Sequence, residues 1–388
     1  MRRKGTMVGV SNAVDLSVKL IQCRSVTPIN DGAIDLLCRE LSESGFECVR
    51  VDRNGICNLF ARWGNKNHDK TFGFNGHTDV VPAGEISSWI EDPFGGVVKD
   101  GWLYGRGAAD MKTAVAAFVS AAIDIVKAKN IDGSIVITLT GDEEAEATDG
   151  TVAILDWMKK NKESMAVCLV GEPTCPKIMG DMIKIGRRGS VSALIKIKGV
   201  QGHVAYPARA LNPLPLAAEL VTLLTQNKLD KGTEYFDAST LAVTSIETGN
   251  TAGNVIPGEC RIMVNIRFND IHTSKSLMDW LKAEAKKIED KSGAQIEVTF
   301  KVSGESFITV PGVLSDLVAA SVKKITGVTA ELSTSGGTSD ARFIREYCPV
   351  VEFGLVGATL HQVNERVEVK HIDQLKSVYK EILLNYFK

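Results

Sequence analysis

The sequence predicts a two-domain α/β protein in which a domain with a mainly parallel sheet is interrupted by an inserted ferredoxin-like α+β domain. The chain has 388 residues, whereas a single domain usually has about 100–200. Strand-like and helix-like segments alternate near both ends of the chain, which is typical of a parallel sheet. Between residues 189 and 302 this order changes to β-α-β-β-α-β, the order of a ferredoxin-like unit.

The first part of the chain contains the alternating elements. Val14, Val18 and Ile21 fall on one face of an expected helix. β-Branched and aromatic residues then mark strands that run into polar loops, and an alanine-rich stretch marks the next helix. The expected segments are the helix 11–22, the strand and loop 71–79, the helix 110–130, and the strands with their loops at 134–145 and 167–174.

The insert begins where apolar and polar residues alternate regularly. Val191, Ile195 and Ile197 alternate with polar residues, which indicates a half-buried strand. We predict strands at 190–199, 239–247, 259–269 and 295–303 with helices at 212–226 and 274–290, followed by a helix at 313–324, a strand at 349–354 and a helix at 371–387. The first domain is then discontinuous, residues 1–188 and 303–388, and the inserted domain is residues 189–302.

The composition excludes several classes of protein. Lys plus Arg number 45 and Asp plus Glu number 47, a formal net charge of −2, so no basic excess favours a nucleic-acid partner. No apolar run approaches the ~20 residues of a membrane helix, and the basic N-terminus lacks the apolar stretch of a secretory signal. The eight cysteines are scattered without a CxxC pair, as reduced thiols are. We expect a cytoplasmic protein with no membrane or nucleic-acid partner.

Side chains of the kinds that bind metals stand in the polar loops after the predicted strands. Because the carboxyl ends of neighbouring parallel strands meet at one edge of a sheet, these loops can converge on one site. Histidines and carboxylates without cysteine suit a pair of divalent cations, with zinc as first choice and cobalt as the alternative. The residues are His77 and Asp79 in GHTD, Asp110 in GRGAADMK, Glu143 and Glu144 in GDEEA, Glu172 in GEP and His361 in ATLHQ.

Each of these pieces alone has an ordinary structural interpretation. An isolated histidine or aspartate at a strand end often caps a turn or faces solvent, and adjacent glutamates are usually solvated. The stretch GRGAAD contains Gly105 and Gly107 but lacks the third glycine of a dinucleotide-binding loop. No GxSxG nucleophile elbow is present, and no cysteine has an adjacent histidine to activate it. It is the complete constellation that argues for a metal site.

Longer strings spread over nearly the whole chain strengthen this interpretation. They resemble the dinuclear metallopeptidase family that includes carboxypeptidase G, acetylornithine deacetylase, aminoacylase and succinyl-diaminopimelate desuccinylase, and GRRGS, QGHVAYP and GGTSD are most similar to the desuccinylase branch. The strings are GHTDVVPAG (76–84), DPFGGVVKDGWLYGRGAADMKTAVAA (92–117), TGDEEAEATDGT (140–151), VGEPT (170–174), GRRGSVSALIKIKGVQGHVAYP (186–207), NVIPGE (254–259), LSTSGGTSDARFI (332–344) and HQVNE (361–365).

The resemblance implies how the metal-type ligands are shared. One ion would be bound by His77 and Glu172, and the other by Glu144 and His361. Asp110 would bridge the two ions. A bridged pair of ions, ~3.5–4 Å apart, activates a water and polarises an amide carbonyl.

The resemblance also implies which groups handle protons. Glu143 would be the general base, taking a proton from the water and giving it to the leaving amine. Asp79 would orient the imidazole of His77, as partners of metal ligands do. The peptide bond between Asp110 and Met111 would be cis.

Groups that recognise the substrate follow from the same resemblance. Arginine binds carboxylates well because its planar fork can donate two hydrogen bonds at once, and an N-succinylated diamino dicarboxylic acid brings three carboxylates. Arg188 alone is interpreted as a residue of an ordinary surface ion pair. The residues matched to the substrate pocket are Arg187, Ser190, Arg267, Gly337 and Thr338.

The inserted domain has a further implied role. It would pair with its twin in a homodimer, so that His203 reaches the partner's active site to stabilise the oxyanion, with Asn254 assisting. The chain departs from the family at Gly357, where an asparagine that touches a substrate carboxylate is usual, which puts fine specificity in doubt.

The implied reaction is hydrolysis of N-succinyl-LL-2,6-diaminopimelate to succinate and LL-2,6-diaminopimelate in lysine and diaminopimelate biosynthesis. A related deacylase, such as acetylornithine deacetylase or aminoacylase, is the alternative. A catalytically silent binding protein with the same fold is the competing class.

Overall fold

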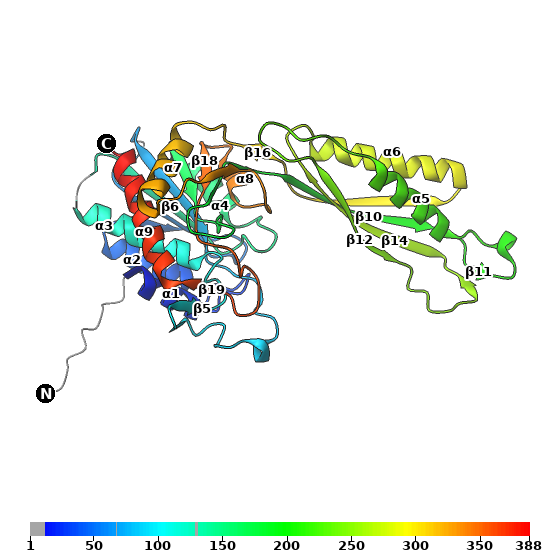
Figure 1. The fold of residues 1–388 in the computed structure, drawn as a ribbon, viewed down its shortest axis with the longest axis horizontal. Coiled ribbons are helices and arrows are strands. Elements are labelled where there is room, and N and C mark those ends of the chain that lie inside the picture. Colours follow the sequence, from blue (N-terminus) through cyan, green and yellow to red (C-terminus); the bar gives the residue numbers. More distant parts are fainter. Residues whose placement is uncertain (1–11, 67, 129–130) are drawn as a thin grey trace. The chain divides into compact units, whose positions relative to one another are not determined.

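The chain folds into two units, each with its own sheet (Figure 1). The structure is a computed structural model that describes residues 12–66, 68–128 and 131–388. The first unit comprises the chain up to Ile185 with Thr309–Ser333 and Ser339–Lys388, and the second comprises Gly186–Ile308 and Thr334–Thr338. The divisions thus fall at 186 and 308 where the sequence analysis placed them at 189 and 302, and residues 334–338, assigned there to the first domain, join the second unit.

The first unit is built on an eight-stranded sheet. Its four central strands β6, β3, β7 and β18 run parallel to one another, and β8 is parallel to β17. The β1–β2, β2–β6 and β18–β8 pairs are antiparallel. β3 and β6 are buried along their whole length, as strands covered on both faces are. In sheet order the strands are β1 (Glu47–Arg50), β2 (Leu59–Trp63), β6 (Ser134–Thr140), β3 (Thr71–His77), β7 (Val167–Val170), β18 (Val350–Glu352), β8 (Met182–Lys184) and β17 (Glu331–Ser333).

Helices cover this sheet. Phe118 of α3 stacks on Phe74 of β3 with ring centroids 4.0 Å apart, and Tyr379 of α9 meets both rings edge-on. No helix in the described ranges is long and apolar enough to cross a membrane. The helices are α1 (Asn12–Gln22), α2 (Ala33–Glu43), α3 (Lys112–Ala128), α4 (Thr151–Lys160), α7 (Val313–Thr326), α8 (Ala341–Ile344) and α9 (Val369–Tyr386). Ser11 and residues 129–130, the expected ends of two helices, lie outside the described residues.

A small antiparallel sheet brings two distant segments of the first unit together. Its strands, in order, are β19 (Arg366–Glu368), β5 (Trp102–Tyr104) and β4 (Val97–Lys99). Arg366 pairs with Tyr104. The loop that follows β5 therefore starts beside the end of the loop that precedes β19.

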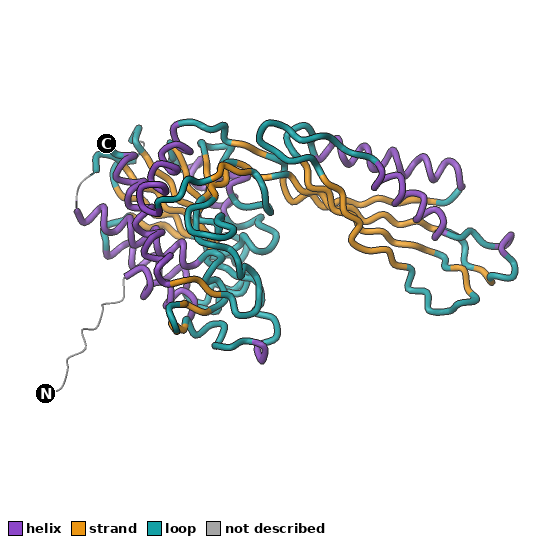
Figure 2. Tube along the Cα trace, viewed as in Figure 1, coloured by secondary structure: helices purple, strands orange, loops and turns teal. Residues whose placement is uncertain are grey.

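The second unit has the ferredoxin-like order predicted from the sequence. Its four strands are antiparallel, and α5 and α6 lie on one face of the sheet (Figure 2). Val191, Ile195, Ile262 and Leu281 belong to the buried cluster between the helices and the sheet. The elements are β10 (Gly189–Lys198), α5 (Pro213–Gln226), β12 (Thr240–Glu247), β14 (Glu259–Phe268), α6 (Ser274–Ser292) and β15 (Gln295–Gly304), with the sheet order β12-β14-β10-β15 and two short pairs, β9 (Gly186–Arg187) with β16 (Phe307–Ile308) and β11 (Gly202–His203) with β13 (Val255–Ile256).

Candidate metal centre

The metal-type residues converge at the carboxyl ends of the central parallel strands. His77 is the last residue of β3, Glu172 follows β7, and Glu144 follows β6. His361 lies in the loop after β18, and Asp110 immediately precedes α3 with a cis peptide bond to Met111, as the resemblance implies. These five residues form two groups of three that share Asp110.

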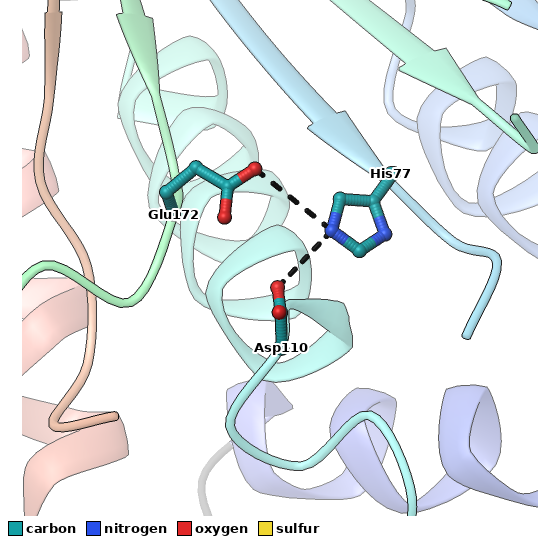
Figure 3. A group of neighbouring side chains, drawn as sticks. All are labelled: His77, Asp110 and Glu172. Atoms are coloured by element: carbon teal, nitrogen blue, oxygen red, sulfur yellow. Dashed lines mark hydrogen bonds and ion pairs between the residues drawn. The ribbon is translucent and has the colours of Figure 1, made fainter. Parts of the chain in front are cut away.

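The first group is His77, Asp110 and Glu172, and all three side chains point at one another (Figure 3). Nε2 of His77 lies 3.1 Å from Oδ1 of Asp110 and 3.9 Å from Oε1 of Glu172. All three residues are buried. The other ring nitrogen of His77, Nδ1, lies 2.9 Å from the backbone carbonyl oxygen of Asp79, so Nε2 is the nitrogen free to bind a metal.

The second group uses the other oxygen of the shared carboxylate. Nε2 of His361 lies 3.2 Å from Oδ2 of Asp110 and 3.0 Å from Oε1 of Glu144. The Glu144 side chain is buried and that of His361 is 44% exposed. His361 has a left-handed backbone with a φ of 58°. Its imidazole is therefore presented from a bend in a loop and not from a helix or a strand.

These donor sets fit two divalent cations. The donor atoms lie 3.0–3.9 Å apart, and four ligands at the ~2.0–2.1 Å of zinc–nitrogen and zinc–oxygen bonds stand roughly 3.3 Å from one another. Each oxygen of Asp110 faces a different imidazole. A single carboxylate can thus bind two ions. If only one ion were bound, the other group of three residues would lack a cation to balance its carboxylates.

The electrostatics of the site are those of a cation site. Hydrogen bonds to Asp110 and Glu144 raise the pKa of His361 to about 10. Burial opposes the charged form of His77, but Asp110, Glu172 and other carboxylates raise its pKa well above the ordinary value. Burial and neighbouring carboxylates also raise the pKa of Glu172 well above its ordinary value. Crowded negative charge contributes to all three shifts, and bound cations would neutralise it.

Glu143 stands beside this centre without joining either group. Its carboxylate makes no hydrogen bond or ion pair with another described residue, while its backbone N–H and that of Glu144 donate to the Asp79 carboxylate at 3.1–3.2 Å. Burial and the carboxylates of Asp340, Glu144 and Asp110 raise the pKa of Glu143 well above its ordinary value, and the charge of bound cations would work against that rise. A carboxylate without hydrogen bonds or ion pairs of its own, next to the site where the proton is released, is suited to proton transfer.

Asp79 is placed differently from the role expected of it. Its carbonyl rather than its carboxylate holds His77, because Oδ1 lies 3.7 Å from Nδ1. The carboxylate instead fixes the backbone of Glu143 and Glu144. Burial raises the pKa of Asp79 to about 6, against the positive charge of His77 and the two N–H donors.

The glycines of GRGAAD serve close packing. Gly105 has a φ of +155° and Gly107 a φ of +86°, and a Cβ at Gly105 would lie 2.4 Å from Ile21 Cγ2. A Cβ at Gly107 would lie 2.8 Å from a methyl carbon of Val80. The loop therefore needs glycine at both positions to reach Asp110 through a tight bend.

The residues matched to the substrate pocket gather in the second unit. Nη1 of Arg187 donates to the carbonyl oxygen of Gly337 at 3.2 Å, next to Thr338. Ser190 pairs with Arg267 across β10 and β14. Their side chains are linked by one amide, since Asn265 donates to Ser190 Oγ at 3.3 Å and accepts from Arg267 Nε at 3.0 Å.

Arg188 joins Arg187 and Arg267 in the group of second-unit arginines that we call the arginine cluster. No ion pair of Arg188 occurs among the described residues, so interpreting it as part of a surface ion pair is wrong. Its buried Nε has no hydrogen-bond partner among the described residues. Burial lowers the pKa of Arg267, and the positive charge of Arg188 lowers it further. Like charges brought together in this way attract anions.

His203 and Asn254 form a separate group at the other end of the second unit. His203 is exposed and pairs with Val255, and the N–H of Val204 donates to the carbonyl of Asn254 at 3.2 Å. At about 3.3 Å per residue, the strand from Ser190 to the end of β10 spans roughly 26 Å. The structure does not bring these two residues to the arginine cluster of the same chain.

Two buried residues at the metal centre have no role in the sequence analysis. Arg106 and Glu365 form an ion pair with side chains 3% and 0% exposed. Both stand inside the strings GRGAAD and HQVNE, so their position next to expected ligands was the available signal.

Comparison with known proteins agrees with this geometry. The sequence model of the family described as Peptidase family M20/M25/M40 matches residues 73–385 of this chain. The chain belongs to this family. The succinyl-diaminopimelate desuccinylase of Ruegeria pomeroyi is 60% identical over 376 residues, covering 97% of this chain and 99% of that protein.

Solved structures of this family share the fold. The M20 family metallo-carboxypeptidase Sso-CP2 from Sulfolobus solfataricus superposes with a TM-score of 0.79 at 18% identity, covering 97% of this chain and 99% of that one. A dinuclear metal binding peptidase of the M20 family from Bacillus subtilis gives a TM-score of 0.73 at 15% identity, with 97% of each chain covered. The fold of this M20 family member is therefore the one its sequence predicts.

Proposed function

We propose that the chain hydrolyses N-succinyl-LL-2,6-diaminopimelate to succinate and LL-2,6-diaminopimelate, a step of lysine and diaminopimelate biosynthesis. The observation that carries the metal-dependent chemistry is the position of Asp110, whose two oxygens face two imidazoles in two ligand groups. The substrate assignment is supported by the relative that is 60% identical over nearly its whole length. A related deacylase remains the alternative that the experiment below tests.

The proposed ligands are His77, Asp110 and Glu172 for one ion and Asp110, Glu144 and His361 for the other. Zinc is our choice, with cobalt as the alternative, because imidazole and carboxylate donors without thiolate suit both. When bound, such ions polarise an amide carbonyl and lower the pKa of water.

Proton transfer falls to Glu143 in this proposal. Its carboxylate makes no bond that would have to break first, so it can accept a proton from water and deliver it to the departing amine nitrogen. Asp79 supports this role by holding the backbone N–H groups of Glu143 and Glu144. That contact fixes the base and its neighbouring ligand on one short, rigid segment.

The arginine cluster is proposed to hold the carboxylates of the substrate. Arg187 and Arg267 supply the positive charge, and the partnerless Nε of Arg188 adds a third guanidinium to the two that the sequence suggests. Ser190, Gly337 and Thr338 lie with them and would contribute the neutral hydrogen bonds. Three carboxylates on the substrate match three guanidinium groups.

A homodimer through the second unit completes the proposal. The length of β10 from Ser190 to its far end, roughly 26 Å, supports a role for His203 and Asn254 in the partner's active site, where they would stabilise the oxyanion. β12 is an edge strand of its sheet, and pairing of such edges removes exposed ladder groups. We place the enzyme in the cytoplasm, where its eight free cysteines stay reduced.

The test is a panel of matched substrates with and without a chelator. N-succinyl-LL-2,6-diaminopimelate should be cleaved with the highest kcat/KM, ahead of N-acetylornithine and N-acetyl amino acids, and the chelator should abolish turnover. A preference for an N-acetyl substrate would replace the assignment by the related deacylase. Full turnover in chelator would remove the metal mechanism, and binding without turnover would indicate the silent binding protein.

A further inference from the structure

Glu365 joins two loops that each carry a proposed metal ligand. Its side chain is fully buried. Oε1 accepts a hydrogen bond from the backbone N–H of Ala109 at 2.7 Å and from that of Asp110 at 3.2 Å. Glu365 itself lies in the loop of His361, so it connects the backbone of the bridging ligand to that loop.

Arg106 makes the reciprocal connection. It lies in the loop of Asp110, and its Nη2 donates to the backbone carbonyl of His361 at 3.3 Å. Its Nη1 donates to Glu365 Oε2 at 2.5 Å and to the Gln362 carbonyl at 3.3 Å. The guanidinium carbon lies 5.4 Å from the centre of the Trp89 ring, so the ring packs against the guanidinium group of Arg106. Each residue of the pair thus stands in one ligand loop and holds the other.

The loop of His361 needs such support. His361 and Asn364 have left-handed backbones with φ of 58° and 64°, a conformation that side chains other than glycine rarely adopt and that surrounding contacts must maintain. The pairing of β5 with β19 brings the two loops into register, but it ends at Tyr104 and Arg366. Beyond that point the N–H of Gly105 donates to the backbone carbonyl of Glu365 at 3.0 Å, and the Arg106–Glu365 pair supplies the side-chain contacts.

We propose that Arg106 and Glu365 are positioning residues that set the spacing between Asp110 and His361, and so the affinity of the site for its cations. Neither residue belongs to a ligand group. The inference rests on the proposed metal centre but not on the identity of the substrate. Partners that orient metal ligands typically contribute ~10–100-fold in metal affinity.

Two conservative variants test the contributions of Arg106 and Glu365 one at a time. Arg106→Lys keeps the positive charge, but a single ammonium cannot span the four acceptors of the guanidinium fork. These acceptors are Oε2 of Glu365 and the backbone carbonyls of His361, Gln362 and Pro82. Glu365→Gln keeps an oxygen for the N–H groups of Ala109 and Asp110 but removes the negative charge that faces Arg106. Each should fold, because volume and most backbone contacts are retained.

A second, partly buried ion pair of the same unit is the matched control. Arg62 and Glu163 are 3.4 Å apart with side chains 12% and 6% exposed, and they touch no proposed ligand. Arg62→Lys and Glu163→Gln make the same chemical changes there. They should leave metal affinity unchanged.

The experiment measures zinc dissociation constants of the full-length apoprotein by competition with a chromophoric chelator, alongside thermal unfolding of each apoprotein. Arg106→Lys and Glu365→Gln should each weaken zinc binding ~10–100-fold. The double variant should lose less than the product of the two losses, because the residues act as one unit. Apo unfolding temperatures should fall no further than in the control variants.

Parent-like zinc affinity in both variants would overturn the inference, as would an equal loss of affinity in the control variants. Loss of the folded apo state in both variants would assign the pair to folding alone and would also overturn it. A parent protein that binds zinc but leaves N-succinyl-LL-2,6-diaminopimelate intact would refute the proposed substrate while leaving the positioning role standing.

Discussion

Glu143 and Glu144 are adjacent and chemically identical, yet the structure gives them different surroundings. Glu144 Oε1 lies 3.0 Å from His361 Nε2 within a ligand group, whereas the carboxylate of Glu143 bonds to no other described residue. Glu143→Gln preserves size and removes the ability to accept a proton. Glu144→Ala removes a ligand. The two variants should therefore fail in different ways.

The sizes of the two losses follow from these contacts. Glu143→Gln breaks no ligand contact, so zinc should bind as in the parent, while kcat should fall by the ~10²–10⁴-fold of a lost general base, or about 3–5 kcal/mol of barrier. Glu144→Ala removes one of the three protein donors of its group. It should weaken zinc binding by more than the ~10–100-fold expected for an outer partner.

Zinc content, zinc affinity and steady-state turnover should be measured on both variants together. Glu146→Gln, an exposed glutamate on the same loop, is the control for charge removal and should behave as the parent. If Glu143→Gln loses a metal while Glu144→Ala keeps both, the two roles are exchanged. If Glu143→Gln keeps full turnover, proton transfer by this carboxylate is refuted.

Four other predictions concern the rest of the molecule. Metal analysis should approach two zinc ions per chain, and chelation should abolish turnover until zinc or cobalt is returned; one ion per chain at saturation would contradict a shared Asp110. Alanine at Arg187 or Arg267 should raise KM for the succinyl substrate by ~10–150-fold, from roughly 1.5–3 kcal/mol per charge-assisted bond, and an unchanged KM in both would remove the arginine pocket. Inactive His203→Ala and Glu143→Gln proteins, mixed and allowed to exchange subunits, should regain about a quarter of parent activity, because half of random dimers are mixed and each has one intact site; no recovery would contradict a role in the partner's site. Burial alone would raise the pKa of Asp230, but its hydrogen-bond donors lower it to about 2 from 3.8, so Asp230→Asn should cost about 2 kcal/mol of stability at pH 7, a difference that is full above pH 3.8 and shrinks as the pH falls towards 2; an equal deficit at pH 3 and 7 in urea unfolding would contradict it.

Much of the fold can be predicted from local patterns along the chain. A composition rich in β-branched residues indicates the strands 71–77 and 134–140, and an alanine-rich composition indicates the helix 112–128. The alternation of apolar and polar residues after Gly189 indicates the inserted sheet. Between residues 23 and 70 the sequence analysis predicts no elements, although α2, β1 and β2 lie there. β1 and β2 have only four and five residues, and such short strands are formed by packing on neighbours more than by their own sequence preference. α2 has 11 residues, and its buried Ile34, Leu37 and Leu41 stand at helical spacing, so its signal was present in the sequence.

The candidate ligands could also be found from the sequence, because each follows or precedes an expected element and parallel strands bring their carboxyl ends to one edge. What their placement leaves open is which atoms meet. Asp110 contacts the imidazole of His77, which is 33 positions away in the sequence, and that of His361, which is 251 positions away. The Asp79 carboxylate holds the backbone of Glu143 and Glu144, and it is the Asp79 carbonyl that contacts His77.

The sequence by itself therefore determined the class of fold and the kinds of ligand, since these depend on residue types and on periodicities of two and 3.6 residues. The family followed separately, from the resemblance of the longer sequence strings. Only the tertiary structure decided that Arg106 and Glu365, 259 positions apart, join the two ligand loops, and that Arg188 belongs to the arginine cluster. Such contacts leave no periodic trace in either segment. They exist because pairing of β5 with β19 and burial between the loops oblige each charged group to find its partner.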